Sequence, residues 1–165
     1  TLFGEPIDVP GHGRGALLAA AGCAVFSVWQ SASMDGGDFT MFEDFSVGWV
    51  ELATRDVDRA QRFYGGLLGW SFMDSANAPA GTRYSEYAVG GTHYGGVLQM
   101  TAEWGDLPEH WSLYVVVPDL DVALSATDAA GGAITVPAFD APGVGRIARI
   151  ADPTGAGLYL VQLGR

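Results

Sequence analysis

The sequence has little positive charge, a single cysteine and no long apolar segment. Eight Lys and Arg residues stand against nineteen Asp and Glu, so the formal net charge of the 165 residues is −11. This charge repels phosphate backbones and anionic lipids, so no nucleic-acid or membrane partner is expected. One cysteine permits no internal disulfide, which fits a reducing compartment and predicts a cytoplasmic protein.

No apolar run reaches the roughly 18 residues of a membrane-spanning helix. The nearest is residues 16–29, ALLAAAGCAVFSVW, which follows Arg14. It is similar to a signal peptide, and AAGC within it is similar to a lipoprotein cleavage box. The alternative is a pair of buried strands joined by a tight turn at residues 21–23, and an internal repeat favours these strands.

The composition predicts a packed core with many tight turns. Apolar residues make up 48% of the chain and the mean hydropathy is +0.18, which argues against disorder. Twenty-four glycines accompany only eight prolines, a balance typical of short strands joined by turns. The length allows one ordinary domain with an appendage.

The segment 47–70, VGWVELATRDVDRAQRFYGGLLGW, predicts a strand, a helix and an exit into a second strand. Side chains alternate along residues 47–54, and Asp56 stands at the position of a helix N-cap. After it Ala60, Phe63, Tyr64 and Leu67 form one apolar helical face. Gly65 and Gly66 are expected to end the helix.

This pattern repeats within the C-terminal part of the chain. Asp56-Val57-Asp58 is matched 63 positions later by Asp119-Leu120-Asp121, and each triplet follows an apolar strand and opens a helix. Three more strands are predicted in each half, at 70–73, 83–89 and 94–100, and at 134–138, 145–151 and 157–163. The second helix is expected at 121–130. The fold class is therefore α+β, with two paired βαβββ modules whose open faces enclose a pocket.

A second repeat relates the N-terminus to the C-terminus. Residues 1–30 match residues 133–162 without a gap, and PGHGR at 10–14 corresponds to PGVGR at 142–146. Residues 1–30 are therefore expected to be the C-terminal strands of a preceding domain. Residues 31–45, polar and acidic, are expected to be a linker, and residues 46–165 a complete domain. Exposed edges on the N-terminal strands predict a homodimer.

Four motifs carry a family resemblance: TRDVDRAQRFYGGLLGW, PDLDVALSATDAAGG, PGVGR and ARIADPTGAGLYLVQ. In this order and spacing they resemble the vicinal oxygen chelate superfamily of glyoxalases, bleomycin-resistance proteins and extradiol dioxygenases. The tandem-domain actinobacterial branch labelled glyoxalase-like or hydroxylase is the most similar. The resemblance implies the paired βαβββ fold, but it leaves the function open because this fold hosts isomerases, lyases, dioxygenases and binding proteins.

In metal-using members, inward residues on the first, fourth, fifth and eighth strands hold a divalent ion, and these are usually His or Glu. The resemblance places Trp49, Gln99, Ser112 and Tyr159 at these positions. Their side chains do not suit a divalent ion, so no metal and no other cofactor is expected. A divalent metal held by Glu51 and His110 is the alternative.

Glu51 is the most informative single residue, because an inward carboxylate needs a partner. One interpretation is a general base, or an acceptor for a ligand hydroxyl. The other is a salt bridge to Arg83, Arg146 or Arg149. The sequence leaves both open.

The aromatic residues predict the ligand. Tyr114 lies two residues after Ser112 and is therefore expected on the same inward face of the strand. Together with Trp49 and Tyr159 it gives an aromatic-walled cleft. The expected function is the binding of a small aromatic organic ligand in this metal-free cleft, with Trp49, Gln99, Ser112, Tyr114 and Tyr159 as ligand-binding residues. The alternative is a metal-dependent or Glu51-based lyase, isomerase or oxygenase.

The remaining reactive residues have simpler interpretations. His93 lies beside a glycine-rich hairpin turn, in GGTHYGG, and is expected to be a surface histidine. Nothing near Cys23 suggests a reactive thiol. The chain contains no nucleophile elbow, phosphate loop or zinc-protease motif.

Overall fold

The computed structural model describes residues 1–165 except 21, 34–39, 77, 79–80 and 165. It contains two compact units. Unit 1 comprises Thr1–Phe39 and Leu52–Trp111, and unit 2 comprises Thr40–Glu51 and Ser112–Arg165. The middle of the expected linker, residues 34–39, lies outside the described residues.

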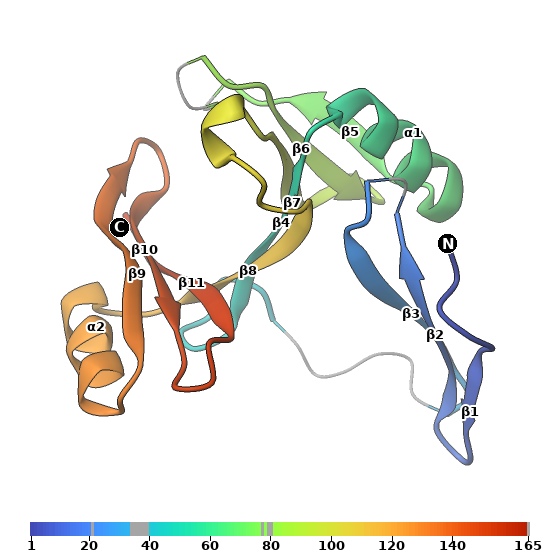
Figure 1. Ribbon diagram of the computed structural model, residues 1–165, viewed down its shortest axis with the longest axis horizontal. Coiled ribbons are helices and arrows are strands. Elements are labelled where there is room, and N and C mark those ends of the chain that lie inside the picture. Colours follow the sequence, from blue (N-terminus) through green and yellow to red (C-terminus); the bar gives the residue numbers. More distant parts are fainter. Residues whose placement is uncertain (21, 34–39, 77, 79–80, 165) are drawn as a thin grey trace. The chain divides into compact units, whose positions relative to one another are not determined.

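The elements of both units are labelled in Figure 1. In chain order they are β1 (Ile7–Val9), β2 (Gly13–Ala19), β3 (Val25–Ser31), β4 (Val47–Thr54), α1 (Val57–Leu68), β5 (Ser71–Asp74), β6 (Tyr84–Val89), β7 (Thr92–Gln99), the 3-10 turn η1 (Ala102–Trp104), β8 (His110–Val116), α2 (Leu120–Ala129), β9 (Ala133–Ala141), β10 (Gly145–Ala151) and β11 (Gly157–Leu163). The order is that of two βαβββ modules preceded by three strands, as the sequence predicts.

Unit 1 is built around α1. The strands follow the order β5-β6-β7-β4 in one sheet and β1-β2-β3 in another. Val57, Ala60 and Tyr64 of α1 are buried together with Leu52 and Val97 of the sheet. Phe26 of β3 also packs against this cluster, so the N-terminal strands are attached to the core of unit 1.

Unit 2 contains the order β4-β8-β11-β10-β9 and the helix α2. β8 and β11 are parallel, whereas β11, β10 and β9 are antiparallel neighbours. Side chains alternate between the two faces of a sheet, and each face has its own apolar cluster. Leu120 of α2 packs with Ala148 and Leu160 on one face, and the other face holds Ile147 and Val161.

Both helices begin at the predicted caps. The carboxylate of Asp56 accepts a hydrogen bond from Arg59 N (2.9 Å), and Asp119 accepts one from Val122 N (3.0 Å). These side chains satisfy backbone donors that have no partner within the helix.

The end of α1 was predicted wrongly. The helix continues through Gly65 and Gly66 to Leu68, and it ends at Gly69, whose φ of 71° is left-handed. A glycine inside a helix costs only about 1 kcal/mol relative to alanine. Gly69 is left-handed and its N–H donates a hydrogen bond to the Gly65 carbonyl (3.0 Å), so the helix ends at the glycine that caps it rather than at the first glycine of the segment.

The repeat of 132 positions is visible in the strand pairing. β2 and β3 begin at Gly13 and Val25, whereas β10 and β11 begin at Gly145 and Gly157, 132 positions later in each case. The pairing register agrees as well. Gly13 lies opposite Ser31 in the first hairpin, and Gly145 lies opposite Leu163 in the second. The repeat detected in the sequence is therefore a repeat of structure, while its assignment to a preceding domain stays a prediction.

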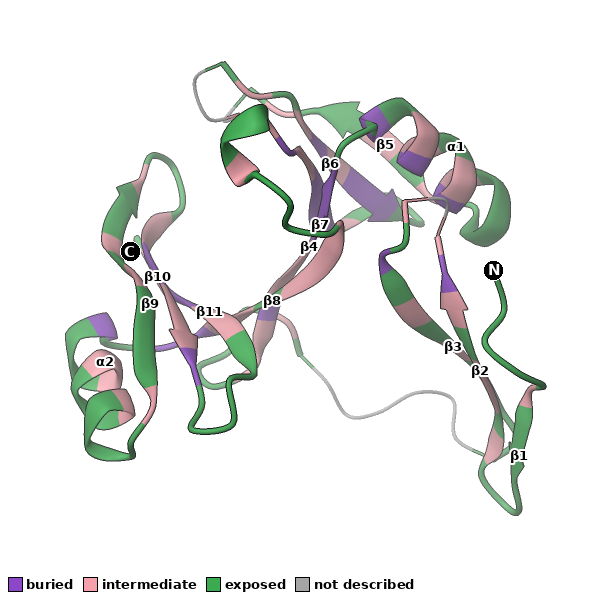
Figure 2. Ribbon diagram, in the orientation of Figure 1, coloured by how far each residue is buried: buried purple, intermediate pink, exposed green. Residues whose placement is uncertain are grey.

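The N-terminal strands are less buried than predicted. Most residues of β2 and β3 are half-buried or exposed (Figure 2), and Trp29 and Val25 of β3 are exposed. The strands pack through a few residues, such as Ala24 and Phe26, rather than through both faces. Residue 21 of the predicted turn lies outside the described residues.

Candidate functional site

Tyr114 and Tyr159 lie on the face of the unit 2 sheet that is opposite α2. Val115, Leu158 and Leu160 pack with the α2 cluster. Tyr114 and Tyr159 alternate with these residues along β8 and β11, and both pack with the cluster on the other face. This face therefore presents aromatic side chains while the first face carries the helix.

The two tyrosines stack across the parallel strands. Tyr159 pairs directly with Tyr114, and their ring centroids are 4.5 Å apart with an interplanar angle of 10°. The Tyr114 hydroxyl donates a hydrogen bond to Glu51 Oε1 (2.9 Å). The Arg149 guanidinium carbon lies 5.9 Å from the centroid of the Tyr159 ring. We call Glu51, Tyr114, Tyr159 and Arg149 the tyrosine face.

The Tyr114 phenol is one partner of the Glu51 carboxylate. Of the three arginines that were candidates for a salt bridge, Arg146 pairs with Asp121 and Arg83 pairs with Asp58. Arg149 donates a hydrogen bond to Thr135 Oγ1 (3.0 Å). The Tyr114 hydroxyl supports the interpretation that Glu51 can accept a hydrogen bond from a hydroxyl group.

The electrostatic surroundings raise the pKa of Tyr159. Burial is the largest cause because it disfavours the phenolate, and the negative charge of Glu51 adds to it. The Arg149 cation acts in the opposite direction. Tyr159 is therefore neutral at physiological pH and able to donate a hydrogen bond.

Glu51→Gln is expected to lower the pKa of Tyr159, because the substitution removes a negative charge, and Arg149→Met is expected to raise it. The raised pKa means that neutral Tyr159 stabilises the fold fully below its usual pKa of about 10. That contribution is lost as the pH rises through the folded-state pKa. Residue-resolved NMR titration of ¹³C-labelled tyrosine measures the shifts, with Glu43→Gln as an exposed control. A rise in the pKa of Tyr159 on Glu51→Gln would contradict this account.

Of the six predicted site residues, Glu51, Tyr114 and Tyr159 are joined by direct contacts, and Trp49 and Ser112 lie on the same strands as Glu51 and Tyr114. Trp49 and Glu51 lie two residues apart on β4, and Ser112 and Tyr114 lie two residues apart on β8, so each pair shares one face of its strand. All four residues are half-buried. Tyr159 joins them through its stacking on Tyr114. These five belong to unit 2.

Gln99 is placed differently. It ends β7 in unit 1, where its side-chain nitrogen donates to the Arg55 carbonyl (2.6 Å) and the Met100 carbonyl (3.3 Å). The 63-residue repeat also relates Tyr159 to Gly96 rather than to Gln99. The predicted fourth-strand position, Gln99, is thus three residues away from the position that the repeat gives. The hydrogen bonds of the Gln99 amide to the two backbone carbonyls indicate a structural role for this amide.

The residues at the expected metal positions do not fit a divalent ion. Trp49, Ser112 and Tyr159 offer an indole, a hydroxyl and a phenol, and the repeat puts Gly96, without a side chain, at the fourth position. Metal sites in proteins use imidazole, carboxylate or thiolate ligands. Within the described ranges, no three His, Cys, Asp or Glu side chains form a group that could hold a metal.

The contacts described for His110, the other residue of the alternative metal site, lie within unit 1. Its Nδ1 forms a hydrogen bond with the Pro108 carbonyl (2.8 Å), and its ring lies 6.2 Å from that of Trp104. His110, Pro108 and Trp104 belong to unit 1, whereas Glu51 belongs to unit 2. The single inward carboxylate therefore has no described imidazole beside it within its own unit.

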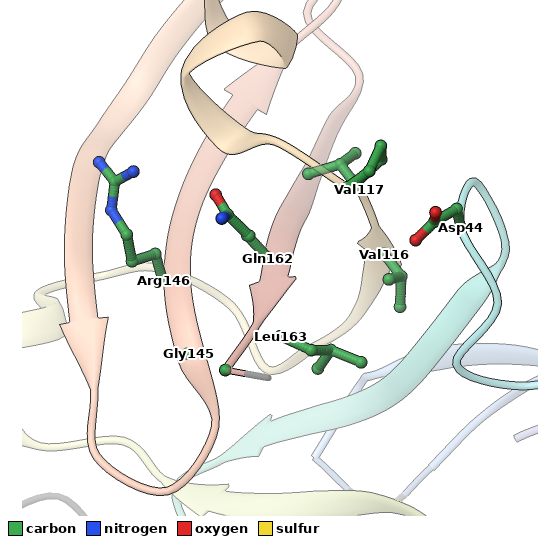
Figure 3. A pocket seen from close by; sticks show the side chains of 9 residues that line it. Asp44, Val116, Val117, Gly145, Arg146, Gln162 and Leu163 are labelled. Carbon is green, nitrogen blue, oxygen red and sulfur yellow. The ribbon is translucent and has the colours of Figure 1, made fainter.

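Unit 2 also contains a cavity of about 340 Å³. Figure 3 shows Arg146 and Gln162 extending from neighbouring strands beside Val116 and Val117. Arg146 makes two hydrogen bonds to Asp121, and Gln162 Oε1 accepts one from Leu120 N. These polar groups secure the beginning of α2, and none of the predicted site residues lines the cavity.

Comparison with known proteins identifies the family. The family model described as "Glyoxalase/Bleomycin resistance protein/Dioxygenase superfamily" matches residues 46–159. The chain belongs to this superfamily. The match covers the first βαβββ module and the second as far as Tyr159 in β11, and it includes all the residues of the tyrosine face.

Two Streptomyces members of the comparison are similar over nearly the whole chain. They are the anthracycline biosynthesis proteins DauV of Streptomyces sp. strain C5 and DnrV of Streptomyces peucetius. Each is 34% identical over 158 residues, which are 96% of this chain and 56% of the relative. The chain thus spans about half the length of these relatives.

A solved structure supports the superfamily fold. The 2,3-dioxygenase LapB from Pseudomonas sp. KL28 matches with a TM-score of 0.64 and 10% sequence identity, covering 99% of this chain and 64% of that one. At this identity the likeness concerns the fold alone. Over the part of the chain that the structure describes, no helix is long and apolar enough to cross a membrane.

The sequence did not reveal the role of Arg149. It was considered only as a salt-bridge partner of Glu51, whereas its guanidinium lies over the Tyr159 ring. The sequence pattern that could have indicated its position is the alternation of side chains along β10, which puts Arg149 on the face opposite Ala148 and Ile150. The pairing of β10 with β11, which places Arg149 against Tyr159, could not be predicted from this alternation alone.

Proposed function

We propose that the chain binds a flat, hydroxylated aromatic molecule on the tyrosine face without a divalent metal. The observation that carries this proposal is the Tyr114–Tyr159 stack, flanked by Glu51 and Arg149. Aromatic faces favour planar ligands through stacking. A carboxylate accepts hydrogen bonds from ligand hydroxyls, and a guanidinium donates them to carbonyl oxygens.

The names of the relatives support this ligand class. Two proteins 34% identical to the chain are named for anthracycline biosynthesis, and anthracyclines are fused-ring hydroxylated quinones. The tyrosine face offers both the stacking surface and the polar groups that such a ring system would use. We also propose that the protein is located in the cytoplasm and forms a homodimer.

A second candidate function is catalysis with Glu51 as general base. The observation that favours it is the 2.9 Å hydrogen bond between Tyr114 Oη and Glu51 Oε1, which offers a path for a proton from a bound hydroxyl to the carboxylate. The reaction class would then be that of an isomerase, a lyase or an oxygenase. Glu51→Gln would keep binding and lose turnover in the enzyme, whereas a binding protein shows no turnover to lose.

The binding experiment uses two soluble probes in buffer containing EDTA. One is alizarin red S, a dihydroxyanthraquinone sulfonate, and the other is anthraquinone-2-sulfonate, which lacks the hydroxyls. The wild-type chain is expected to bind the hydroxylated probe, and Tyr159→Ala is expected to weaken that binding about tenfold. This change corresponds to about 1.4 kcal/mol, within the range of an aromatic stacking contact.

The control variant is Phe3→Ala, which truncates an exposed aromatic residue of unit 1. It should bind the probes like the wild type. Equal affinity of Tyr159→Ala and wild-type protein, both shown to be folded by circular dichroism, would contradict the proposed site. Binding that disappears in EDTA and returns with a divalent salt would contradict the metal-free part.

A further inference from the structure

The sheet of unit 1 has a face that lies away from α1 and carries a polar cluster. Ser85 and Tyr87 of β6 point toward the helix side: Ser85 Oγ accepts a hydrogen bond from Gln61 of α1 (3.0 Å), and Tyr87 stacks on Trp70 at 4.1 Å. Glu86 lies between them in sequence, so its side chain extends from the opposite face.

On that face the Glu86 carboxylate holds two neighbours. Ser75 Oγ donates to Glu86 Oε1 (2.7 Å), and His93 Nδ1 lies 2.7 Å from Glu86 Oε2. The side chains of His93 and Glu86 are 36% and 24% exposed, so the pair is partly shielded yet reachable. The three residues come from β6, from β7 and from the segment after β5, and the cluster therefore spans the sheet.

A β-bulge directs His93 toward Glu86. The regular pairing of β6 with β7 runs as far as Tyr87 opposite Gly95, after which Ala88 pairs with His93 and Tyr94 is passed over. A bulge inserts one residue and turns the following side chains. Without it, His93 would occupy the other face of β7.

The partner of Nδ1 fixes the hydrogen-bonding role of Nε2. An ionised carboxylate only accepts hydrogen bonds, so the imidazole carries a proton on Nδ1. In the neutral ring Nε2 is then an acceptor. A hydroxyl more acidic than an alcohol, such as that of a phenol or an enol, is the natural donor to this nitrogen.

The internal repeat relates this cluster to the tyrosine face. Positions 63 residues apart equate Glu86 with Arg149 and Gly96 with Tyr159. The ring of Tyr84 lies over Gly96, against the position where a Cβ atom would be, so an aromatic ring covers this position of β7 too. Glu86 pairs directly with Gly96, which sets the carboxylate beside that ring.

We infer that Glu86 and His93, beside the ring of Tyr84, bind the hydroxyl of a phenolic or enolic ligand through Nε2 of His93. The site belongs to unit 1 and stands on its own contacts, independently of the binding proposed for unit 2. Ser75 and Glu86 act as positioning residues, and His93 is the residue that contacts the ligand.

The first test is the tautomer of His93. In ¹⁵N-labelled protein, at a pH where the imidazole is neutral, His93 is expected to be the Nδ1–H tautomer. Glu86→Gln is expected to reduce this preference, because an amide can also donate to Nδ1. The Nε2–H tautomer in the wild-type protein would overturn the inference.

The second test follows His93 during titration with alizarin red S and with anthraquinone-2-sulfonate. The hydroxylated probe alone is expected to shift the Nε2 resonance of His93, and His93→Gln, introduced into Tyr159→Ala protein so that only this site is measured, is expected to weaken its binding about tenfold. His12→Gln is the matched control and should change neither property. An unmoved Nε2 resonance, or equal affinity of Tyr159→Ala protein with and without His93→Gln in variants that remain folded, would overturn the inference.

Repeating the titration in Tyr159→Ala separates the two sites. If the tyrosine face fails to bind but the His93 resonance still shifts, the inference stands without the proposed function. If Tyr159→Ala weakens probe binding while the His93 resonance stays unmoved, the proposed function stands and the inference falls.

Discussion

Tyr64→Ala is expected to lower the free energy of unfolding by about 3–5 kcal/mol, the range for large-to-alanine substitutions of buried aromatic residues. Tyr64 is 1% exposed. Its ring stacks on Trp70 at 5.4 Å and meets Trp111 edge-on at 5.3 Å. Phe26 of β3 contacts it at 5.4 Å, so the substitution opens a cavity between α1, the sheet and the N-terminal hairpin.

Urea unfolding followed by circular dichroism measures this loss. Tyr64→Phe keeps the ring and removes only the hydroxyl that accepts from Trp111 Nε1 (3.3 Å), so a loss of about 1 kcal/mol is expected. Tyr94→Ala, at an exposed position of β7, should stay within about 0.5 kcal/mol of the wild type. A similarly small change for Tyr64→Ala would show that the cluster does not carry the stability of unit 1.

Hydrogen exchange adds a local readout to the same variant. Because Phe26 anchors β3 to α1 through Tyr64 and Phe63, the amides of β2 and β3 should lose protection in Tyr64→Ala. Protection of β10 and β11, which lie in unit 2, is expected to change less. Equal loss in both hairpins would indicate global unfolding rather than a released hairpin.

Glu109→Ala has the second largest expected effect, a loss of about 2–3 kcal/mol of unfolding free energy. The Glu109 side chain is 8% exposed. It accepts hydrogen bonds from Thr54 Oγ1 (2.9 Å), Arg55 N (3.0 Å) and Arg59 Nη2 (3.1 Å). Removal of the carboxylate leaves the buried Thr54 hydroxyl, which is 1% exposed, without this acceptor.

The ion pair itself contributes a small part of this loss. The Arg59 side chain is 40% exposed, and solvent screens a charge pair of this kind to about 1 kcal/mol or less. Arg59→Met should therefore cost less than Glu109→Ala, and exposed Glu103→Ala should be nearly neutral. The comparison uses urea unfolding, and equal losses for Arg59→Met and Glu109→Ala would show that the charge pair dominates.

Local chemistry made much of the fold predictable. Asp56 and Asp119 mark both helices because a short carboxylate satisfies the first amides of a helix. The repeat of 132 positions, read from residue identity, corresponds to paired strands with the same register in β2–β3 and β10–β11. The end of α1 could not be read in this way, because Gly65, Gly66 and Gly69 are all possible stops and only the left-handed φ of Gly69 identifies the one that caps the helix.

The site was less predictable because it depends on contacts between distant strands. The alternation of side chains along β8 and β11 predicted that Tyr114 and Tyr159 lie on the inward face. The stacking of their rings depends on the parallel pairing register of the two strands, which the sequence did not predict. His93 was expected to be a surface residue, because no sequence pattern predicts the β-bulge that turns its side chain toward Glu86. The position of Gln99 was counted without the repeat that relates Tyr159 to Gly96, and its place in the site stays a prediction.

The equal registers of the two hairpins have a consequence for how the chain folds. β2–β3 and β10–β11 share one hairpin register, so we expect the two hairpins to compete during folding for the parallel pairing that β8 makes with β11. Such competition between similar parts is a source of misassembly in repeat-containing proteins. Tyr159 faces Tyr114 at the correct junction, whereas the corresponding position of β3 is Ser27. We therefore expect the Tyr114–Tyr159 stack to favour the pairing of β8 with β11 over a pairing of β8 with β3.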